Sequence, residues 1–387
     1  MTKKSDTPAI RFKGFTDTWE QRKLSDVATM HARIGWQNLR TSEFLDSGDY
    51  MLITGTDFND GAVNYSTCHF VEKERYEQDK HIQIKNGSIL ITKDGTLGKV
   101  AYVQGLSTPA TLNAGVFNVE IKDETKVDNK YLFQYLKAPF LMDYVDKKAT
   151  GGTIKHLNQN ILVDFPVVMP SKAEQEAIGV YFQQLDNLIT LHQRKYDKLT
   201  NVKKSMLEKM FPKNGSNVPE IRFKGFTEAW EQRKVSELFR VTRGYVLAAT
   251  QTETTKTDEK PYPVYSSQTK DQGLMGYYKD YLYEDAITWT TDGANAGTVN
   301  YRAGKFYCTN VCGVLLSNEV KANQMIAEAL NSVAKGYVSY VGNPKLMNNV
   351  MADIVIQIPT QAEEREQLSS FFAKLDNLIT LHQREPT

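Results

Sequence analysis

Hydrophobic and polar positions follow a strand pattern along two stretches of the chain, one before Pro170 and one between Pro212 and Pro359. Short runs rich in Tyr, Val, Ile, Thr and Phe alternate there with turn signals. The clearest signals are Asp60-Gly61, Asn86-Gly87, Asp94-Gly95 and Asp292-Gly293. Apolar spacing closer to 3.6 residues predicts shorter helices near Asp128–Asp146 and Lys321–Lys335. The pattern therefore predicts two mixed, mostly β domains.

A helical pattern begins after Pro170. Ser171 and Glu174 have the spacing of a capping box. Apolar residues then recur every three or four positions until Phe211-Pro212, with one gap at His192. They are Ile178, Phe182, Leu185, Ile189, Tyr196, Leu199, Val202, Met206 and Met210. Forty residues would form a helix of about 60 Å, and so narrow an apolar seam requires a partner helix. The stretch from about Thr360 to Arg384 can supply one, which predicts an antiparallel helix pair.

Two segments of the chain occur twice. PAIRFKGFTDTWEQRK (8–23) returns as PEIRFKGFTEAWEQRK (219–234) with three changes, and LDNLITLHQR (185–194) returns unchanged at 375–384. The offsets are 211 and 190 residues, so the flanks are fixed while the middles differ in length. Weaker echoes link 89–103 with 286–302, and 155–170 with 345–359. A binding scaffold with two specificities would look like this, and so would a duplication that drifted; the nearly unchanged flanks favour the scaffold.

The repeat predicts an α+β fold with a pseudo-two-fold internal repeat. We expect two mostly-β domains joined by long antiparallel, coiled-coil-like helices. The expected boundaries are 1–170 for the first domain, 171–212 for the spacer helix, 213–359 for the second domain and 360–387 for a second, shortened helix. The first helix continues past LHQR for KYDKLTNVKKSMLEKMF, whereas the second copy is followed by Glu385-Pro386-Thr387. The arrangement is circular, so we expect the two termini to lie close together.

The amino-acid composition excludes several classes of protein. The 47 basic and 46 acidic residues give a formal charge of +1, which argues against binding nucleic acid through bulk charge but not through local basic loops. No apolar run is long enough for a membrane span, and the polar start lacks a signal-peptide core. Three cysteines give no disulfide framework. We expect a cytoplasmic protein.

Signatures of enzymes are missing. A base methyltransferase would carry Asp/Asn-Pro-Pro-Phe/Tyr, but Asn343-Pro344 is followed by Lys345. Gly98-Lys99 lacks the rest of a phosphate-binding loop. The six histidines (31, 69, 81, 156, 192 and 382) show no ligand spacing, and Cys308 and Cys312 lack a second pair, so we expect no metal site. Asp57 and Asp60 suit turns better than a nuclease site. No catalytic residues are therefore predicted.

Side chains suited to nucleic acid gather instead in the turns of both middles. Around the Asp-Gly turns lie Lys93, Thr96 and Lys99 in one copy, and Thr291 and Asn295 in the other. Further candidates are Gly152, Thr153, Lys155 and His156 in TGGTIKH, Ser266, Ser267, Gln268, Thr269 and Lys270 in one polar run, and Arg33, Trp36, Arg243 and Tyr245 after the flanks. Any one of them could be a solvated turn residue; their recurrence in both copies favours DNA recognition.

With these motifs the chain resembles the specificity (S) subunit of a type I restriction–modification system, of the staphylococcal type. The matching residues are IRFKGFT…W in both copies, DGTLGKV and DGANAGTV, TGGTIKHLN, and the helix starts PSKAEQEAI…LDNLI and PTQAEEREQL…LDNLI. The resemblance covers essentially the whole chain. It departs at the short closing helix and at Gly342-Asn343-Pro344-Lys345, which replaces the GGT loop and makes Lys345 a further candidate.

The resemblance implies a non-catalytic DNA-recognition subunit in which each domain reads half of a bipartite site in double-stranded DNA. Two modification subunits that methylate adenine with S-adenosylmethionine, and restriction subunits that cleave using ATP and Mg²⁺, would be its partners; the chain itself would hold no cofactor. Exposed apolar helix faces, with Leu185, Ile189, Leu199 and Met206, are the expected docking positions. Two alternatives remain at this point: a protein-binding adaptor with two interaction domains, and a nuclease with an unfamiliar site.

Overall fold

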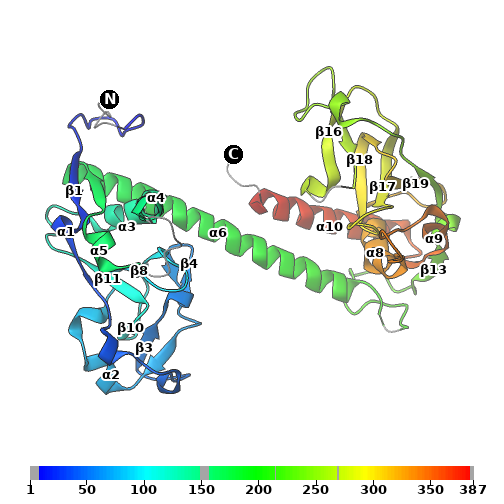
Figure 1. Ribbon diagram of the computed structural model, residues 1–387. Helices are drawn as coiled ribbons and strands as arrows, with labels where there is room; N and C mark the ends of the chain where they lie inside the picture. The colour runs from blue at the N-terminus through cyan, green and yellow to red at the C-terminus, as the bar shows by residue number, and fades with distance from the viewer. Residues whose placement is uncertain (1–7, 149–156, 214, 268–269, 384–387) are drawn as a thin grey trace. The chain divides into compact units, whose positions relative to one another are not determined.

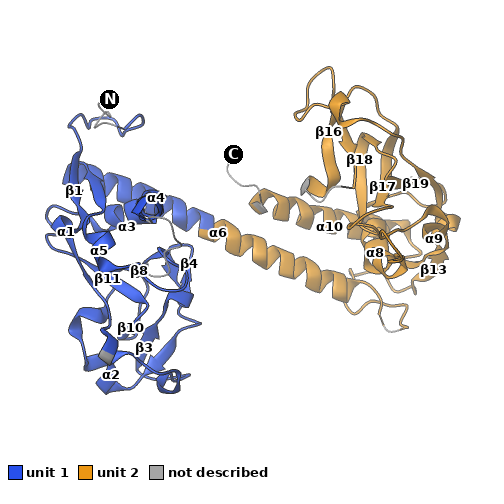
Figure 2. Cartoon of the chain, viewed as in Figure 1, with its two compact units in different colours: residues 1–189 blue, residues 190–387 orange. Residues whose placement is uncertain are grey.

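The computed structural model describes residues 8–148, 157–213, 215–267 and 270–383. The chain forms two compact units, residues 1–189 and 190–387 (Figure 2). Both hold β-sheets and helices, which confirms the α+β class (Figure 1). The expected closeness of the termini concerns residues 1–7 and 384–387, which lie outside the described residues.

The first unit is built on a six-stranded sheet of order β2-β11-β8-β9-β5-β4, antiparallel except for the parallel pair β5 and β9. A four-stranded sheet has the order β6-β3-β10-β7, and β1 pairs with β12. The strands are β1 (Glu20–Lys23), β2 (Ala28–His31), β3 (Tyr50–Ile53), β4 (Phe58–Asn59), β5 (Ala62–Val63), β6 (His69–Val71), β7 (Gln83–Ile84), β8 (Ile89–Thr92), β9 (Val100–Tyr102), β10 (Ala110–Leu112), β11 (Val116–Ile121) and β12 (Pro166–Met169). The helices are α1 (Leu24–Val27), α2 (Lys73–Glu77), α3 (Asn129–Lys137), α4 (Phe140–Lys148) and α5 (Gln159–Val163), with 3₁₀ turns η1 (Gly35–Gln37), η2 (Thr41–Glu43), η3 (Gly55–Asp57) and η4 (Lys80–Ile82).

The second unit has one six-stranded sheet, β14-β19-β17-β18-β15-β16, in which β15 and β18 pair in parallel as β3 and β10 do in the first unit, and it pairs β13 with β20. Its strands are β13 (Glu231–Lys234), β14 (Phe239–Arg243), β15 (Tyr262–Tyr265), β16 (Leu274–Tyr278), β17 (Tyr283–Thr290), β18 (Val299–Cys308), β19 (Cys312–Ser317) and β20 (Val355–Ile358). Its helices are α7 (Val235–Leu238), α8 (Gln324–Ala334), α9 (Asn348–Asp353) and α10 (Ala362–Gln383), with 3₁₀ turns η5 (Ala249–Gln251), η6 (Lys270–Gly273) and η7 (Lys335–Tyr337). Helices α3, α4 and α8 lie where the apolar spacing predicted short helices.

Both units are closed by the same contact. An arginine of the repeated flank donates two hydrogen bonds of 2.7 Å to a buried glutamate at the start of the following long helix: Arg11 to Glu174 in the first unit and Arg222 to Glu364 in the second. The pairing of β1 with β12 and of β13 with β20 fastens the same flank to the strand before that helix. The repeated flank sequence therefore forms the same contacts in both units.

The capping box predicted at Ser171 is replaced by this contact. Both carboxylate oxygens of Glu174 accept from Arg11, and a guanidinium is a stronger partner than a backbone amide. Gln175 fastens the helix start instead, because its side chain accepts from the Asp128 amide at 2.9 Å and donates to the Pro170 carbonyl at 2.9 Å.

The unequal middles differ mainly between two strands. Strand β3 pairs in parallel with β10 as β15 does with the end of β18, and the Asn113 and Thr309 amides donate at 2.9 Å to the Ile53 and Tyr265 carbonyls. Between β3 and β8 the first unit holds β4, β5, β6, α2 and β7, whereas between β15 and β17 the second holds η6 and β16. The extra residues of the first unit therefore enlarge one part of an architecture that both units share.

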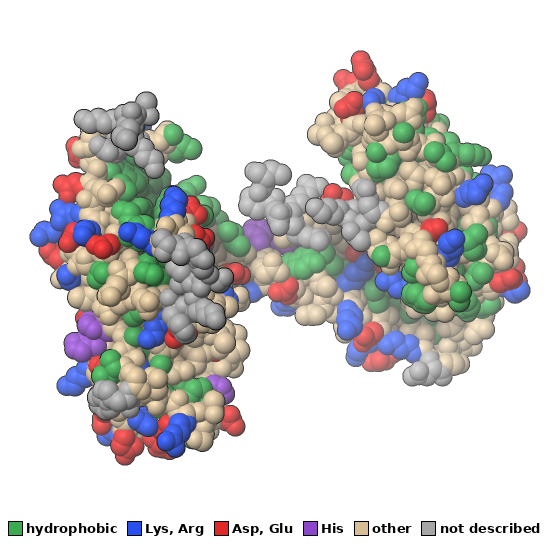
Figure 3. Space-filling view, in the orientation of Figure 1, with side chains coloured by type: hydrophobic (Ala, Val, Ile, Leu, Met, Phe, Trp, Pro, Cys, Tyr) green, Lys and Arg blue, Asp and Glu red, His purple; other side chains and the backbone are tan. Residues whose placement is uncertain are grey.

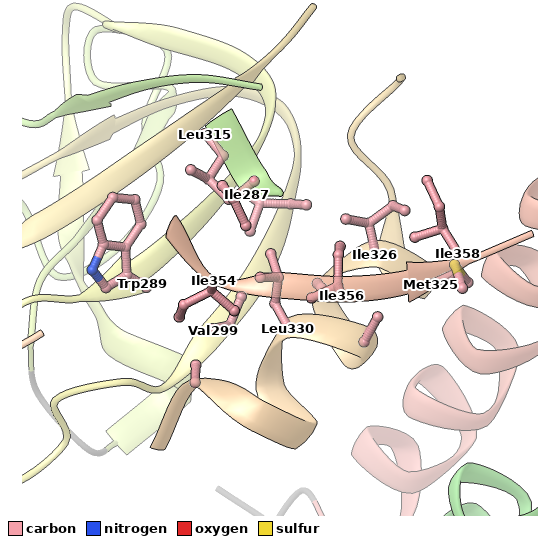
Figure 4. Packing of buried hydrophobic residues seen from close by; sticks show 14 of the residues in the cluster. Ile287, Trp289, Val299, Leu315, Met325, Ile326, Leu330, Ile354, Ile356 and Ile358 are labelled. Carbon is pink, nitrogen blue, oxygen red and sulfur yellow. The ribbon is translucent and has the colours of Figure 1, made fainter. Parts of the chain in front are cut away.

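The second unit is organised around one large core. Ile287, Trp289 and Leu315 of the sheet pack with Ile326 and other residues of α8 and β20 (Figure 4). The indole Nε1 of Trp289 donates to the Leu346 carbonyl at 3.0 Å, which ties the loop before α9 to this core. The core thereby holds the end of β17 and the loop before α9 together.

Helix α6 (Lys172–Met210) runs from the first unit into the second, and its bounds agree with the sequence pattern. Within the second unit, its later half lies antiparallel to α10. Phe211, just past α6, contacts Phe372 at 5.8 Å between ring centroids; Lys203 Nζ lies 2.6 Å from an Asp376 carboxylate oxygen; and the Nδ1 atoms of His192 and His382 are 2.9 Å apart. The expected helix pair is present there. No helix in the described part of the chain has the length and apolar character needed to cross a membrane.

We predict that Arg222→Ala destabilises the second unit by about 3 kcal/mol, because it leaves the Glu364 carboxylate buried without its partner. The control is Arg233→Ala, which removes an exposed ion pair with Glu237 and should have a much smaller effect. Urea unfolding followed by tryptophan fluorescence measures both. Equal effects of the two substitutions would show that the Arg222–Glu364 contact does not hold the flank.

Candidate nucleic-acid interface

In each six-stranded sheet a glycine-dependent turn joins two neighbouring inner strands, at the end of the strands that we call the sheet edge. In the first unit the turn joins β8 to β9, and the Gly98 amide donates to the Thr92 carbonyl at 3.0 Å. In the second unit it joins β17 to β18, and the Gly297 amide donates to the Thr290 carbonyl at 2.9 Å. Both glycines have positive φ, +70° and +81°, a conformation that side-chain-bearing residues rarely adopt. The two Asp-Gly motifs therefore build the same turn.

A second segment lies against each turn. The Leu157 amide donates to the Lys93 carbonyl at 2.8 Å, and the Leu346 amide donates to the Thr291 carbonyl at 2.9 Å. In both units this segment precedes a short helix, α5 or α9. Two stretches that are far apart in sequence thus meet at one sheet edge in each unit.

The second unit shows how that segment is shaped. Ser339 and Lys345 exchange two backbone hydrogen bonds of 2.9 Å, which closes a hairpin whose tip residues Tyr340 and Val341 are 70% and 93% exposed. The Gly293 amide donates to the Pro344 carbonyl at 3.0 Å, so the hairpin rests on the Asp-Gly turn. Tyr340 was not among the sequence candidates, although Tyr and Val before a Gly-Asn-Pro turn are a hairpin signal.

Other predicted residues join this edge. Asn295 donates to the Ser267 carbonyl at 2.9 Å, and the Thr309 hydroxyl lies 3.0 Å from that of Ser266, so the polar run after β15 lies beside the turn. Strand register aligns Arg243 and Trp289 with the same residue of β19, which puts the end of β14 at the same edge. Both Arg243 and Tyr245 are exposed. The second unit therefore gathers four segments around one exposed surface.

Comparison with known proteins identifies this architecture. The chain matches the family described as the type I restriction modification DNA specificity domain over residues 16–201 and 227–387. The chain belongs to this family. Each matched range contains one of the turns, so the specificity domain occurs twice.

Individual relatives agree. A Mycoplasma pneumoniae protein provisionally named as the N-terminus of a type I specificity subunit is 37% identical over 131 residues, covering 33% of this chain and 68% of the relative. The specificity subunit of the type I restriction enzyme MpnII, also from Mycoplasma pneumoniae, is 29% identical over 170 residues, covering 42% of this chain and 46% of the relative. This chain thus spans less than half of that second relative. The crystal structure of a type I restriction-modification S subunit from M. genitalium has the same fold, with a TM-score of 0.71 at 14% identity over 96% of this chain and 92% of that one.

One predicted DNA contact of the specificity domain is wrong. Arg33 is 1% exposed, and its guanidinium donates to the Leu112 carbonyl at 3.1 Å, to Gln78 Oε1 at 3.0 Å and to the Thr111 hydroxyl at 3.3 Å. Burial lowers the pKa of this arginine. Arg33 therefore links β10 to the segment around α2 inside the domain, and its position after the flank misled the sequence argument.

The other candidates differ in accessibility. Thr96, Lys99 and Lys345 are exposed, with Lys345 Nζ 3.9 Å from an Asp292 carboxylate oxygen. Lys93 is half-buried, with Nζ 5.4 Å from the centre of the Phe117 ring, and the Thr291 hydroxyl donates to the Val311 carbonyl at 3.0 Å. Trp36 lies in η1 and Lys270 in η6. Gly152, Thr153, Lys155, His156, Gln268 and Thr269 lie outside the described residues.

The four residues predicted to bind partners on the long helix fall into an exposed pair and a packed pair. Leu185 and Ile189 are 37% and 59% exposed. Leu199 and Met206 pack instead against the core of the second unit, so they serve the helix pair rather than offering a free surface. Docking of a partner through Leu185 and Ile189 stays a prediction.

Three potential metal ligands that the sequence spacing did not reveal come together in the first unit. Ligand atoms of His31, His81 and Glu120 lie within 4.8 Å of one another, because β2 pairs with β11 and the Asn118 side chain holds the His81 carbonyl at 3.0 Å. The two imidazole rings are stacked, with centroids 4.5 Å apart and planes 17° apart. Lone pairs in two nearly parallel ring planes do not converge, so this arrangement favours ring stacking over metal ligation.

The three cysteines are buried thiols. Burial raises the pKa of Cys68 to about 12 and that of Cys312 to about 11, and it also raises the pKa of Cys308. A protonated, buried thiol is neither a ready nucleophile nor a ready metal ligand.

From this burial we predict that a thiol-specific chromogenic disulfide reagent at pH 8 labels the native chain slowly and labels all three cysteines once guanidinium unfolds it. Fast labelling of one thiol in the native chain would contradict the buried placement. The rate of colour development gives the answer directly.

For Arg33 we predict that Arg33→Ala destabilises the first unit by about 2–4 kcal/mol, because several buried acceptors lose their donor at once. Exposed Lys99→Ala should change stability by less than about 0.5 kcal/mol. Thermal unfolding of the two variants distinguishes the structural arginine from the surface lysine.

Proposed function

We propose that this chain is the DNA-recognition subunit of a type I restriction–modification complex, and that each unit reads one half of a bipartite site. One observation carries the proposal: the same sheet edge, with the same turn, is built twice from segments of different sequence. Turn and hairpin residues can vary without disturbing the sheet beneath them. Such a scaffold suits two different half-sites.

The surface chemistry of that edge suits DNA. Lys99 and Lys345 are exposed cations beside the two turns, and Arg243 and Tyr245 lie exposed in the second unit. Hydroxyl and amide groups of Ser266, Ser267 and the Asp-Gly turns can reach base edges or phosphates. On the face drawn in Figure 3, basic side chains lie among acidic ones in both units. Local contacts rather than one large basic field would therefore hold the duplex.

The proposal assigns catalysis to other subunits. Two modification subunits would supply S-adenosylmethionine and transfer the methyl group to adenine, and restriction subunits would supply ATP-dependent cleavage with Mg²⁺. The exposed apolar face of α6 around Leu185 and Ile189 is the proposed docking surface for the modification subunits. The chain itself would carry no cofactor and no catalytic group, and it would act in the cytoplasm, where its DNA lies.

The decisive test is methylome sequencing of cells that express this chain with its modification subunits. We expect one bipartite motif containing methylated adenine in each half. Exchange of residues 20–170 for those of another specificity subunit should change one half of the motif and leave the other half intact. A motif that survives the exchange unchanged would refute the assignment of one half-site to each unit.

Lysines at the sheet edges give a finer prediction. Lys99→Ala or Lys345→Ala should weaken binding of the reconstituted complex to its target and reduce the salt dependence by about one released counterion each. The matched controls are Lys13→Ala and Lys224→Ala, which are exposed at equivalent positions of the repeated flanks. Fluorescence anisotropy over a range of salt concentrations measures the slope. Equal losses from control and test lysines would show that the sheet edges are not the contact surface.

A further inference from the structure

Two histidines meet between the helices α6 and α10 of the second unit. His192 lies on α6 and His382 on α10, and each belongs to one copy of the repeated segment LDNLITLHQR. Because the two helices are antiparallel there, the repeated histidine meets its own copy, and the two Nδ1 atoms are 2.9 Å apart. Sequence spacing could not reveal this pair, because 190 residues separate its members.

The two rings face each other through their Nδ1 atoms. The ring centroids are 5.1 Å apart, which is farther than the two nitrogens, and the ring planes are inclined at 49°. The nitrogens are therefore the facing edges of the rings, and both are directed into the space between the helices. The stacked rings of His31 and His81 differ in this respect, because their planes are only 17° apart and their lone pairs do not converge.

One proton is shared in this contact. Two neutral imidazoles form an Nδ1–H···Nδ1 hydrogen bond only when one ring carries its proton on Nδ1 and the other carries it on Nε2. When both rings carry the proton on Nε2, two lone pairs face each other. That second arrangement repels by itself, and a cation between the nitrogens makes it favourable.

The separation of the nitrogens suits a single metal ion. Transition-metal ions bind imidazole nitrogen at about 2.0–2.1 Å. Two such nitrogens lie about 2.9 Å apart when they bind at right angles and about 3.3 Å apart at a tetrahedral ion. The Nδ1 atoms of His192 and His382 are already at the first of these separations. Imidazole is a good ligand for Cu²⁺, Ni²⁺ and Zn²⁺.

The surroundings of the pair allow an ion to enter. His192 is exposed and His382 is half-buried, so water can reach the space between them. Burial and the charges of His192 and Lys195 lower the pKa of His382, which favours the neutral imidazole that metal ions require. Within the described part of the chain, no third His, Cys, Asp or Glu side chain joins the pair, so water would supply the remaining ligands.

We propose that His192 and His382 bind one divalent transition-metal ion through their Nδ1 atoms, with water completing its coordination. The ring that donates in the metal-free pair would take the Nε2–H tautomer, so the chain loses no net proton. The ion would link α6 to α10 about 16 Å along α6 from the contact between Lys203 and Asp376. It would fasten the helix pair and take no part in methyl transfer.

The test uses the full chain without an affinity tag. Cu²⁺ is the spectroscopic probe, because nitrogen ligands split its electron paramagnetic resonance signal. We expect a site with two nitrogen ligands, and His192→Ala or His382→Ala should weaken Cu²⁺ binding at least about tenfold. Zn²⁺ at about a hundredfold excess over its dissociation constant should raise the midpoint of thermal unfolding by about 5 °C, and His192→Ala should remove this rise.

Two controls separate this pair from other surface groups. The double substitution His31→Ala and His81→Ala removes the stacked histidines of the first unit and should leave the two-nitrogen signal intact. Lys195→Ala changes an exposed residue about one turn from His192, and it should not weaken binding, because it removes a nearby positive charge. Thermal unfolding without metal checks that each variant is folded.

The proposal fails if His192→Ala and His382→Ala leave Cu²⁺ binding unchanged in folded chains, or if the His31 and His81 substitutions remove the two-nitrogen signal. An equal effect of Zn²⁺ on the unfolding of the parent chain and of His192→Ala also overturns it, because the ion would then not link the helices through this pair. These assays contain no DNA, so their failure leaves the methylome test of DNA recognition untouched.

Discussion

The ion pair between the flank and the long helix is the contact on which both domains depend. Arg11 with Glu174, and Arg222 with Glu364, each form two short charge-assisted hydrogen bonds around a buried carboxylate. A buried carboxylate without its arginine is costly, so the flank is held in one position. With the flank fixed, β1 pairs with β12 and β13 pairs with β20. The segments that precede and follow each six-stranded sheet are therefore held together.

That frame permits variation at one sheet edge. The turns after Thr92 and Thr290 are determined by backbone hydrogen bonds and by glycines with positive φ, so the side chains between them carry little of the stability. The segments before α5 and α9 are joined to these turns by backbone hydrogen bonds, from Leu157 to Lys93 in the first unit and from Leu346 to Thr291 and Gly293 to Pro344 in the second. A domain of this construction can exchange its surface residues and keep its fold, as a reader of varied DNA sequences requires.

Because the surface residues can vary while the sheet stays fixed, the two units can differ and still share one fold. The first unit has additional short strands and α2 between β3 and β8, and Arg33 is buried between β10 and the segment after α2. The second unit uses Trp289 to join its sheet to the hairpin loop, and it covers its helix with residues 195–211. Each difference lies beside the shared sheet rather than within it, which is why a common register survives.

The sequence by itself determined the repeat, the α+β class, the long helix and the presence of Asp-Gly turns and polar loops in both copies, because these follow from local periodicity, turn chemistry and repeated segments. Only the tertiary structure decided which candidates face solvent. Arg33 and Lys99 look alike as cations near turns, yet one is buried by strands distant in sequence and the other is exposed. Phe182 and Phe372 occupy equivalent positions of the repeat, yet Phe182 is exposed whereas Phe372, which packs against Phe211, is buried. Burial depends on which distant segments come together, and a sequence pattern records only the near ones.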